Sequence, residues 1–272
     1  MSDFRLKHPF SIELEFDSER VTREKLGELL ATLNPGQVTE YPHLGLADHW
    51  AVAPIHEGLS ILSPVFPASN ESLDHLSAAI ALLNFEGYSQ EFSSPISLKN
   101  SFFLNVGVAD LTLMEVLEVV RAAHLIEPAI KTLLPASRYN HRSCKFLHRF
   151  MEEPPSSLRH LTALTAKEAA VSIFKYLPAG MLQVRYFSGT SNINKVMFWL
   201  LLWCSVIDRT VLEGPPEGPL DTFDKIANWL RWPTEGQGPQ VMARGFFANR
   251  VRSLREARAR RGSAPAGANS EG

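Results

Sequence analysis

The stretch "FSIELEF", residues 10–16, alternates apolar and polar side chains, and this alternation sets the expectation for the whole fold. In an extended chain every second side chain shares a face, so the apolar residues Ile12 and Leu14 point to one side. Glu13 and Glu15 then point to the other side. One face of this strand should pack on a core, while the second face is either wetted by solvent or forms a site.

Further periodic patterns follow along the chain. Alternation predicts strands at residues 49–54, 58–66, 101–108 and 181–190, and helical spacing predicts helices at residues 17–34, 71–87, 110–134, 137–151, 165–177, 194–211 and 221–232. In the helix over 110–134 we expect Asp110 or Thr112 as the N-cap and His124 on the buried stripe. Strands interspersed with long helices predict an α+β domain, with a mostly antiparallel sheet covered by helices on one face.

The C-terminal region differs from the rest in charge. Residues 244–261 contain seven arginines against the single acid Glu256, and the chain ends in the small, polar run "GSAPAGANSEG". We therefore expect one α+β domain over residues 1–240. A basic tail over residues 241–272, first helical and then disordered, is expected to follow it.

Bulk composition excludes several classes of protein. The formal net charge of −2 disfavours a general nucleic-acid binder, and two cysteines, Cys144 and Cys204, are too few for a disulfide scaffold. The most apolar run, residues 196–207, is shorter than the roughly 18 residues needed to span a bilayer. A cytoplasmic protein without a membrane span is the expectation.

Two later strands extend the polar column that Glu13 and Glu15 begin. Alternation places Phe103 and Asn105 on one face of their strand, and it places Gln183, Arg185 and Phe187 on one face of theirs. If these strands belong to one sheet, the five side chains could line a shared polar surface.

The order of these segments resembles the amidoligase family. The stretches that carry the resemblance are "FSIELEF", "GLSILSP", "SFFLNVGVADLTLMEVLEVVRAAHLIEPAIKTLLPASRYN" and "LQVRYFSGT", within roughly residues 10–209. Members of this family are similar to glutamine synthetase and glutamate-cysteine ligase in their catalytic domain. The resemblance implies a glutamine-synthetase-like fold and an ATP-dependent carboxylate–amine ligase, with ATP and Mg²⁺ as cofactors and a small molecule or peptide carboxylate as substrate.

The resemblance also implies roles for individual residues. Glu13 and Glu15 match the family's Glu-x-Glu pair and would hold the metal, while Arg138 and Arg185 match family arginines and would be catalytic. These two arginines, together with Asn105 and Gln183, would contact the nucleotide. From the residues alone, Arg185 could equally contact an anion or form an ion pair with the glutamates.

Four positions depart from the family pattern. Ser60 and Gln183 stand where glutamates are expected, and Phe103 and Asn105 replace two histidines. A magnesium–triphosphate site needs several hard oxygen ligands with negative charge, so these changes weaken it. Two hypotheses remain, a diverged ligase and a non-catalytic binding module that keeps the fold; a scaffold acting through the basic tail is a third.

Overall fold

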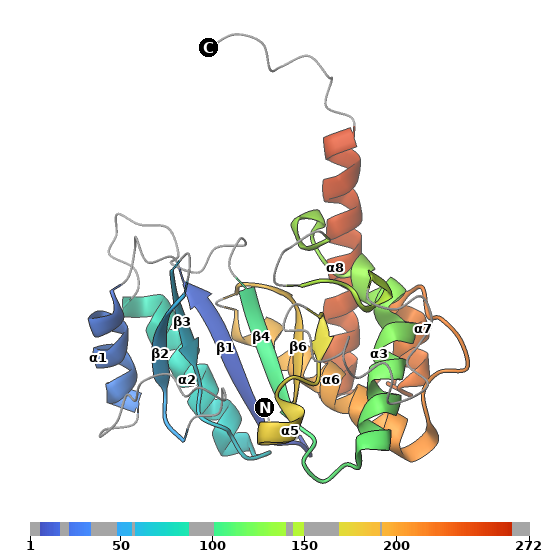
Figure 1. Ribbon diagram of the computed structural model, residues 1–272. Coiled ribbons are helices and arrows are strands. Elements are labelled where there is room, and N and C mark those ends of the chain that lie inside the picture. The colour runs from blue at the N-terminus through green and yellow to red at the C-terminus, as the bar shows by residue number, and fades with distance from the viewer. Residues whose placement is uncertain are drawn as a thin grey trace.

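The computed structural model describes residues 6–16, 22–33, 48–55, 58–86, 101–139, 144–149, 169–190 and 192–262. Within them the chain forms a mixed α+β structure built on a single six-stranded sheet, as the sequence predicts (Figure 1). No helix in these segments is both long enough and apolar enough to cross a membrane.

The sheet is antiparallel throughout and has the strand order β2-β3-β1-β4-β6-β5. Its strands are β1 (Phe10–Phe16), β2 (Ala51–Ile55), β3 (Gly58–Leu62), β4 (Ser101–Gly107), β5 (Val171–Ser172) and β6 (Met181–Ser188). The N-terminal strand therefore lies at the centre of the sheet, between β3 and β4. This position brings Glu13 and Glu15 beside strands that come much later in the sequence.

Helices connect and cover these strands. They are α1 (Arg23–Leu33), α2 (Asn70–Glu86), α3 (Leu113–Thr132), α5 (Tyr176–Ala179), α6 (Ile193–Glu213), α7 (Phe223–Trp229) and α8 (Pro239–Gly262), with short 3-10 turns η1 (Ala136–Arg138) and η2 (Leu147–Arg149). In α3, Thr112 is the N-cap, and its side chain and that of Glu115 form a capping box. Thr112, rather than Asp110, is therefore the cap.

The core lies between the sheet and the helices α2, α3 and α6. Figure 1 shows α2 and α6 behind the strands, and the side chains of Ile12, Leu14 and Val184 are fully buried on this side. The apolar stripe of α6 supplies Trp199 and Trp203, both of which are buried. Burial of such large side chains is the main stabilising contribution, and it leaves the opposite face of the sheet free for polar residues.

A β-bulge in β6 changes the alternation that the sequence predicts. Leu104 pairs with Val184 and Phe102 pairs with Phe187, so Arg185 and Tyr186 together oppose the single residue between them on β4. The predicted placement of Phe187 beside Arg185 is therefore wrong. The Phe187 ring packs on the helix side, 4.5 Å from the Trp199 ring.

Two predicted helices are absent from the described residues. Residues 144–149 of the helix expected over 137–151 form an isolated bridge and the turn η2, and residues 169–172 of the helix expected over 165–177 form a bridge and β5. The backbone of Ala170 bonds to Lys145 and Arg185. Pairing with β6 thus overrides the local helical pattern, which periodicity alone cannot reveal.

The helix α8 starts at the predicted domain boundary but is joined to the core. Ala243 and Phe247 are fully buried, and the Phe247 ring lies 4.8 Å from the Phe223 ring of α7. Arg250 donates a hydrogen bond from Nε to the carbonyl of Leu133 at 2.6 Å. Further along α8, Arg258 donates from Nη2 to the carbonyl of Leu134 at 3.1 Å, and only the last part of the helix extends away from the body of the molecule (Figure 1).

Candidate functional site

The sheet face opposite the helices carries polar side chains from four adjacent strands, β3, β1, β4 and β6. Strand register places Ser60 of β3 opposite Glu15, and Phe103 of β4 opposite Glu13. Asn105 lies opposite both Ser11 of β1 and Gln183 of β6. The prediction that Glu13, Glu15 and Arg185 share one face of one sheet is confirmed, and this surface is called the polar face below.

Glu13 sits at the centre of the polar face with only 12% of its side chain exposed. Ser60 donates from Oγ to Oε1 of Glu13 at 3.2 Å, and Gln183 donates from Nε2 to Oε2 at 3.5 Å. The ammonium group of Lys175 lies 3.5 Å from the same Oε2, and 7% of the Lys175 side chain is exposed. A nearly buried lysine is thus the counter-ion of a nearly buried carboxylate.

Lys175 is a site residue that sequence reasoning missed. It precedes the short helix α5, which returns the chain to β6, and its carbonyl accepts bonds from the backbone N–H groups of Ala179 and Met181. Residues 165–177 read as an amphipathic helix, so no spacing pattern related Lys175 to Glu13. Only the fold of the α5 turn brings the two residues together.

Glu15 is anchored by the backbone of the neighbouring strand. Its Oε2 accepts a bond of 2.8 Å from the N–H of Ser101, at the start of β4. The side chain is half-buried. This bond to the backbone fixes the direction of the Glu15 carboxylate on the polar face.

A chain of amide groups links the central strands to Arg185. Asn105 donates to Ser11 Oγ at 2.9 Å, and Gln183 donates to Asn105 Oδ1 at 3.1 Å. Arg185 in turn donates from Nη1 to Gln183 Oε1 at 3.1 Å. Ser11, Asn105 and Gln183 are buried. Buried amides are stable only with partners of this kind, so Gln183 and Asn105 serve to position Arg185 and Glu13.

Phe103 supports the guanidinium group of Arg185. The central carbon of that group lies 4.1 Å from the centre of the Phe103 ring, which is itself buried. An aromatic ring beneath a guanidinium stabilises it by cation–π attraction and fixes its plane. Phe103, which cannot coordinate a metal, therefore holds the half-exposed guanidinium of Arg185 in position.

Arg138 is fully buried and is engaged by protein acceptors. It donates to the carbonyl oxygens of Tyr186 at 3.4 Å and Arg185 at 3.0 Å, and to Ser101 Oγ at 3.3 Å. Burial lowers its pKa, and the nearby Cys144 and Glu15 oppose that shift. The two carbonyls belong to the bulged residues of β6, so Arg138 stabilises the bulge; its catalytic and nucleotide-binding role stays a prediction.

The side chains on the polar face do not favour a magnesium–ATP site. Mg²⁺ requires several oxygen ligands, whereas both oxygens of Glu13 face hydrogen-bond donors and one of them faces an ammonium group. In the segments that the structure describes, no three His, Cys, Asp or Glu residues come together as a metal-binding group. ATP and Mg²⁺ as cofactors therefore stay a prediction, and the donor set does not fit them.

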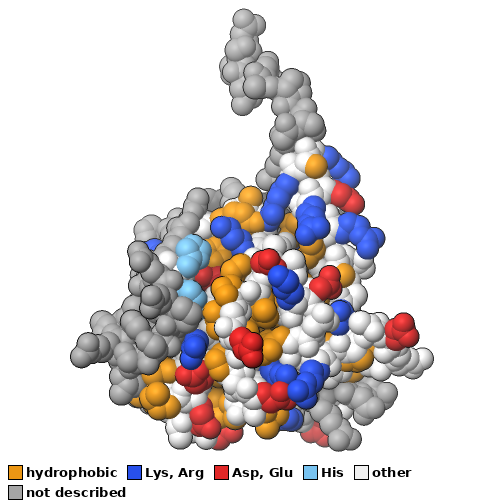
Figure 2. Space-filling view, turned by 90° about the vertical axis from the view of Figure 1, so that its right-hand side faces the viewer, with side chains coloured by type: hydrophobic (Ala, Val, Ile, Leu, Met, Phe, Trp, Pro, Cys, Tyr) orange, Lys and Arg blue, Asp and Glu red, His pale blue; other side chains and the backbone are white. Residues whose placement is uncertain are grey.

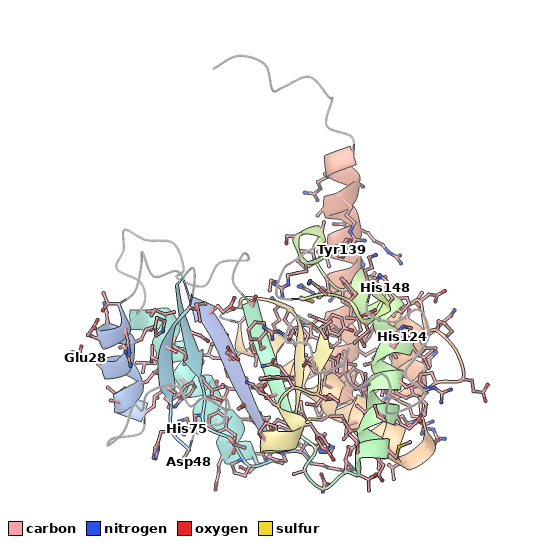
Figure 3. The ribbon with its side chains drawn as sticks, viewed as in Figure 1. Glu28, Asp48, His75, His124, Tyr139 and His148 are labelled. Carbon is pink, nitrogen blue, oxygen red and sulfur yellow. The ribbon has the colours of Figure 1, made fainter. Side chains whose placement is uncertain are left out.

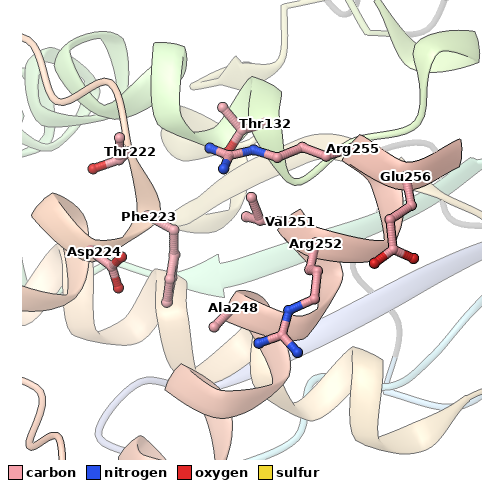
Figure 4. Close-up of a pocket in the computed structure, with 9 residues that line it drawn as sticks. All are labelled: Thr132, Thr222, Phe223, Asp224, Ala248, Val251, Arg252, Arg255 and Glu256. Carbon is pink, nitrogen blue, oxygen red and sulfur yellow. The ribbon is translucent and has the colours of Figure 1, made fainter. Parts of the chain in front are cut away.

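A separate pocket of about 360 Å³ lies where α8 meets α7 and the end of α3 (Figure 4). Arg252 and Arg255 line it together with Asp224 and Glu256. Figure 4 shows the Arg255 guanidinium extending toward Thr132, away from Arg252. The pocket therefore carries both signs of charge, which gives no support to a nucleic-acid groove in the basic tail.

No protein-family model matches the sequence of this chain, and no curated protein matches it either. The resemblance to amidoligases accordingly remains a hypothesis that depends on the order of the motifs.

Proposed function

We propose that the chain is a binding module with an amidoligase-like, glutamine-synthetase-like sheet, whose polar face binds a small molecule or peptide end that carries a carboxylate. The observation that carries this proposal is the Glu13–Lys175 pair, 3.5 Å apart and almost buried. In a ligase a metal ion would have to neutralise the glutamates. Here an internal lysine neutralises Glu13, so the face needs no metal to be stable.

Arg185 is the group best suited to meet the ligand. It is half-exposed, its plane is fixed on Phe103, and its Nη1 is bonded to Gln183. A guanidinium held in this way recognises planar carboxylates through paired N–H donors. Glu15 nearby favours a ligand that also carries an amine or amide N–H, as amino acids and peptides do.

Binding of a carboxylate tests this proposal directly. In isothermal titration of the full chain, N-acetylglycine should bind with a millimolar Kd, whereas the uncharged N-acetylglycinamide should not bind. Arg185→Gln should weaken the binding at least about tenfold, since a charge-assisted hydrogen bond contributes roughly 1.5–3 kcal/mol. Equal affinity for the two compounds, or an unchanged Kd in Arg185→Gln, would contradict the proposal.

The rival function is an ATP-dependent amidoligase, and the observation that favours it is the confirmed placement of Glu13, Glu15 and Arg185 on one face. Titration with Mg²⁺ and ATP separates the two functions. We expect weak, millimolar binding without turnover, and we expect Lys175→Met to raise the affinity for Mg²⁺ by freeing Glu13. Micromolar binding with turnover that Glu13→Gln abolishes would establish the ligase instead.

The double change Glu13→Gln with Glu15→Gln provides a second measure. In a binding module it should mainly destabilise the fold, by about 3 kcal/mol, because Lys175 loses its buried counter-ion. Urea unfolding would measure this loss. If stability, carboxylate binding and ATP binding all stayed unchanged, the polar face would be an ordinary solvated surface.

A further inference from the structure

A buried carboxylate on the far side of the sheet orients a histidine. Glu127 of α3 is 2% exposed and accepts four hydrogen bonds, from the backbone N–H groups of Leu147 at 2.6 Å and His148 at 3.1 Å, from Tyr186 Oη at 2.7 Å, and from His148 Nδ1 at 2.9 Å. Burial and the Glu127 carboxylate raise the pKa of Tyr186 well above its usual value, so its hydroxyl remains a donor. Both oxygens of Glu127 are thus fully engaged.

The contact with Glu127 determines which nitrogen of His148 is available. An acceptor at 2.9 Å places the proton on Nδ1, and Nε2 has no hydrogen-bond partner among the described residues. Half of the His148 side chain is exposed. The ring is therefore fixed in position and tautomer, with one nitrogen left for a ligand.

His148 lines a pocket of about 470 Å³ between α3, η2 and the loop before α7. Apolar walls come from Leu125, Pro128, Phe146 and Pro219, and the cation Lys131 lies on the same rim. Figure 3 shows His124, His148 and Tyr139 together on the α3 side of the molecule, and Figure 2 shows histidine surface beside hydrophobic surface on that side. The sequence-based placement of His124 in the core is wrong, because this histidine is half-buried and lines the pocket.

Lys131 is presented to the pocket by aromatic rings. Its ammonium group lies 5.1 Å from the centre of the Tyr139 ring and 5.8 Å from that of Phe146. Arg121, a second cation on the rim, pairs with Glu118 at 3.5 Å. Glu217 is the one exposed acid among the lining residues, while Glu127 is committed to His148 and Tyr186. The rim of the pocket therefore carries cationic hydrogen-bond donors, while its walls are apolar.

We propose that this pocket is a second binding site, which takes a small organic carboxylate with an apolar body. The carboxylate would contact Lys131 and the Nε2 of protonated His148, and its apolar part would pack on Leu125, Pro128 and Phe146. Glu127 acts here as a positioning residue, since it holds the imidazole through Nδ1 and does not itself face the ligand. This proposal is independent of the polar face, which lies on the other side of the sheet.

Benzoate is a suitable probe because it joins one carboxylate to one apolar ring. In isothermal titration of the full chain at pH 6, benzoate should bind with a millimolar Kd, and the uncharged benzamide should bind at least fivefold more weakly. His148→Asn retains an amide N–H close to the position of Nδ1 and so can keep the bond to Glu127, but it removes Nε2. It should weaken benzoate binding at least fivefold, as should Lys131→Met.

Two controls keep this experiment decisive. Lys225→Met, which removes an exposed lysine of α7, and Arg185→Gln, which acts on the polar face, should both leave the Kd of benzoate unchanged. Equal binding of benzamide and benzoate would overturn the proposal. So would an unchanged affinity in both His148→Asn and Lys131→Met.

The pH dependence supplies a readout that a purely structural histidine would not give. Around His148 the charged or titratable groups are Glu127 and Tyr186 on the buried side and Arg121, His124, Lys131 and Glu217 around the pocket. Because only the doubly protonated ring can donate from Nε2 to a carboxylate while Nδ1 is bonded to Glu127, benzoate should bind severalfold more tightly at pH 6 than at pH 8. His148→Asn should lose this difference while His124 is retained; persistence of the full difference would show that His148 is not a ligand-binding group.

Discussion

Replacing Lys195 by methionine should stabilise the protein, and the gain should shrink as the pH rises. Lys195 lies in the first turn of α6, where its backbone N–H donates to the N-cap Asn192, and 9% of the residue is exposed. Burial, together with the nearby cations Arg250 and Arg138, lowers the pKa of Lys195 to about 7. A charged ammonium group is therefore disfavoured in the folded chain.

The direction of the pH effect follows from proton binding in the two states. Between about pH 7 and the ordinary lysine pKa of 10.5, the unfolded chain keeps the Lys195 proton and the folded chain releases it. Stability therefore rises with pH in this window. At pH 7 about half of the folded molecules carry the proton, and at pH 9 almost none do. At ~1.36 kcal/mol per pKa unit, the wild type should therefore become more stable by about 2 kcal/mol between pH 7 and pH 9.

Urea unfolding of the wild type and Lys195→Met at pH 7, 8 and 9 measures this effect. The stability difference between the two proteins should fall by about 2 kcal/mol across the series, because only the wild type can release the lysine proton. The series stops at pH 9 because burial raises the pKa of Cys144 to about 11, so ionisation of this thiol in the unfolded chain then lowers stability. The exposed Lys225 provides the control, since Lys225→Met should show no such trend. A difference that stays constant within about 0.5 kcal/mol would refute the reasoning, because Lys195 would then be charged and solvated.

Three further substitutions test individual contacts by urea unfolding. Glu127→Gln should destabilise the fold by about 3 kcal/mol, since an amide cannot accept from all four donors; a change below 1 kcal/mol would contradict the engaged carboxylate. Arg138→Lys should destabilise the fold by about 2 kcal/mol, because an ammonium group cannot replace the planar guanidinium that reaches two carbonyls and a hydroxyl. Unchanged stability would show that these hydrogen bonds contribute little. Gly180→Ala should destabilise by about 2 kcal/mol, because φ is +60° and the new Cβ would lie 2.5 Å from Ala109 Cβ. The matched control is Gly245→Ala in α8, where the new Cβ meets nothing within 4 Å. This change should stabilise the protein by about 1 kcal/mol, because alanine favours the helix more than glycine does. Equal effects of the two changes would show that the φ angle and close contact of Gly180 do not matter.

Alternation predicted the polar face because it depends on local geometry. Glu13 and Glu15 are two residues apart on one strand, and their shared face follows from the pleat whatever the neighbouring strands do. The same rule failed at Phe187, where an extra residue in β6 is visible only through its pairing with β4. Periodicity of a single segment cannot detect such a shift in register.

The partners of the two sites were beyond sequence reasoning for a different reason. Lys175 meets Glu13 across 162 positions of the chain, and His148 meets Glu127 from a turn that reads as part of a helix. Each contact requires the path of a connecting segment, which no spacing rule supplies. The long helices α3 and α6, in contrast, were predicted correctly because each carries its own apolar stripe over about 20 residues.

The bulge in β6 also connects the two sides of the sheet. Arg185 belongs to the polar face and Tyr186 bonds to Glu127 behind the pocket, yet the two residues share one peptide group. Arg138 holds the carbonyls of both. The two sites thus share the backbone of the bulge but not their side chains, so a change confined to the Arg185 side chain should leave Tyr186, Glu127 and His148 in place.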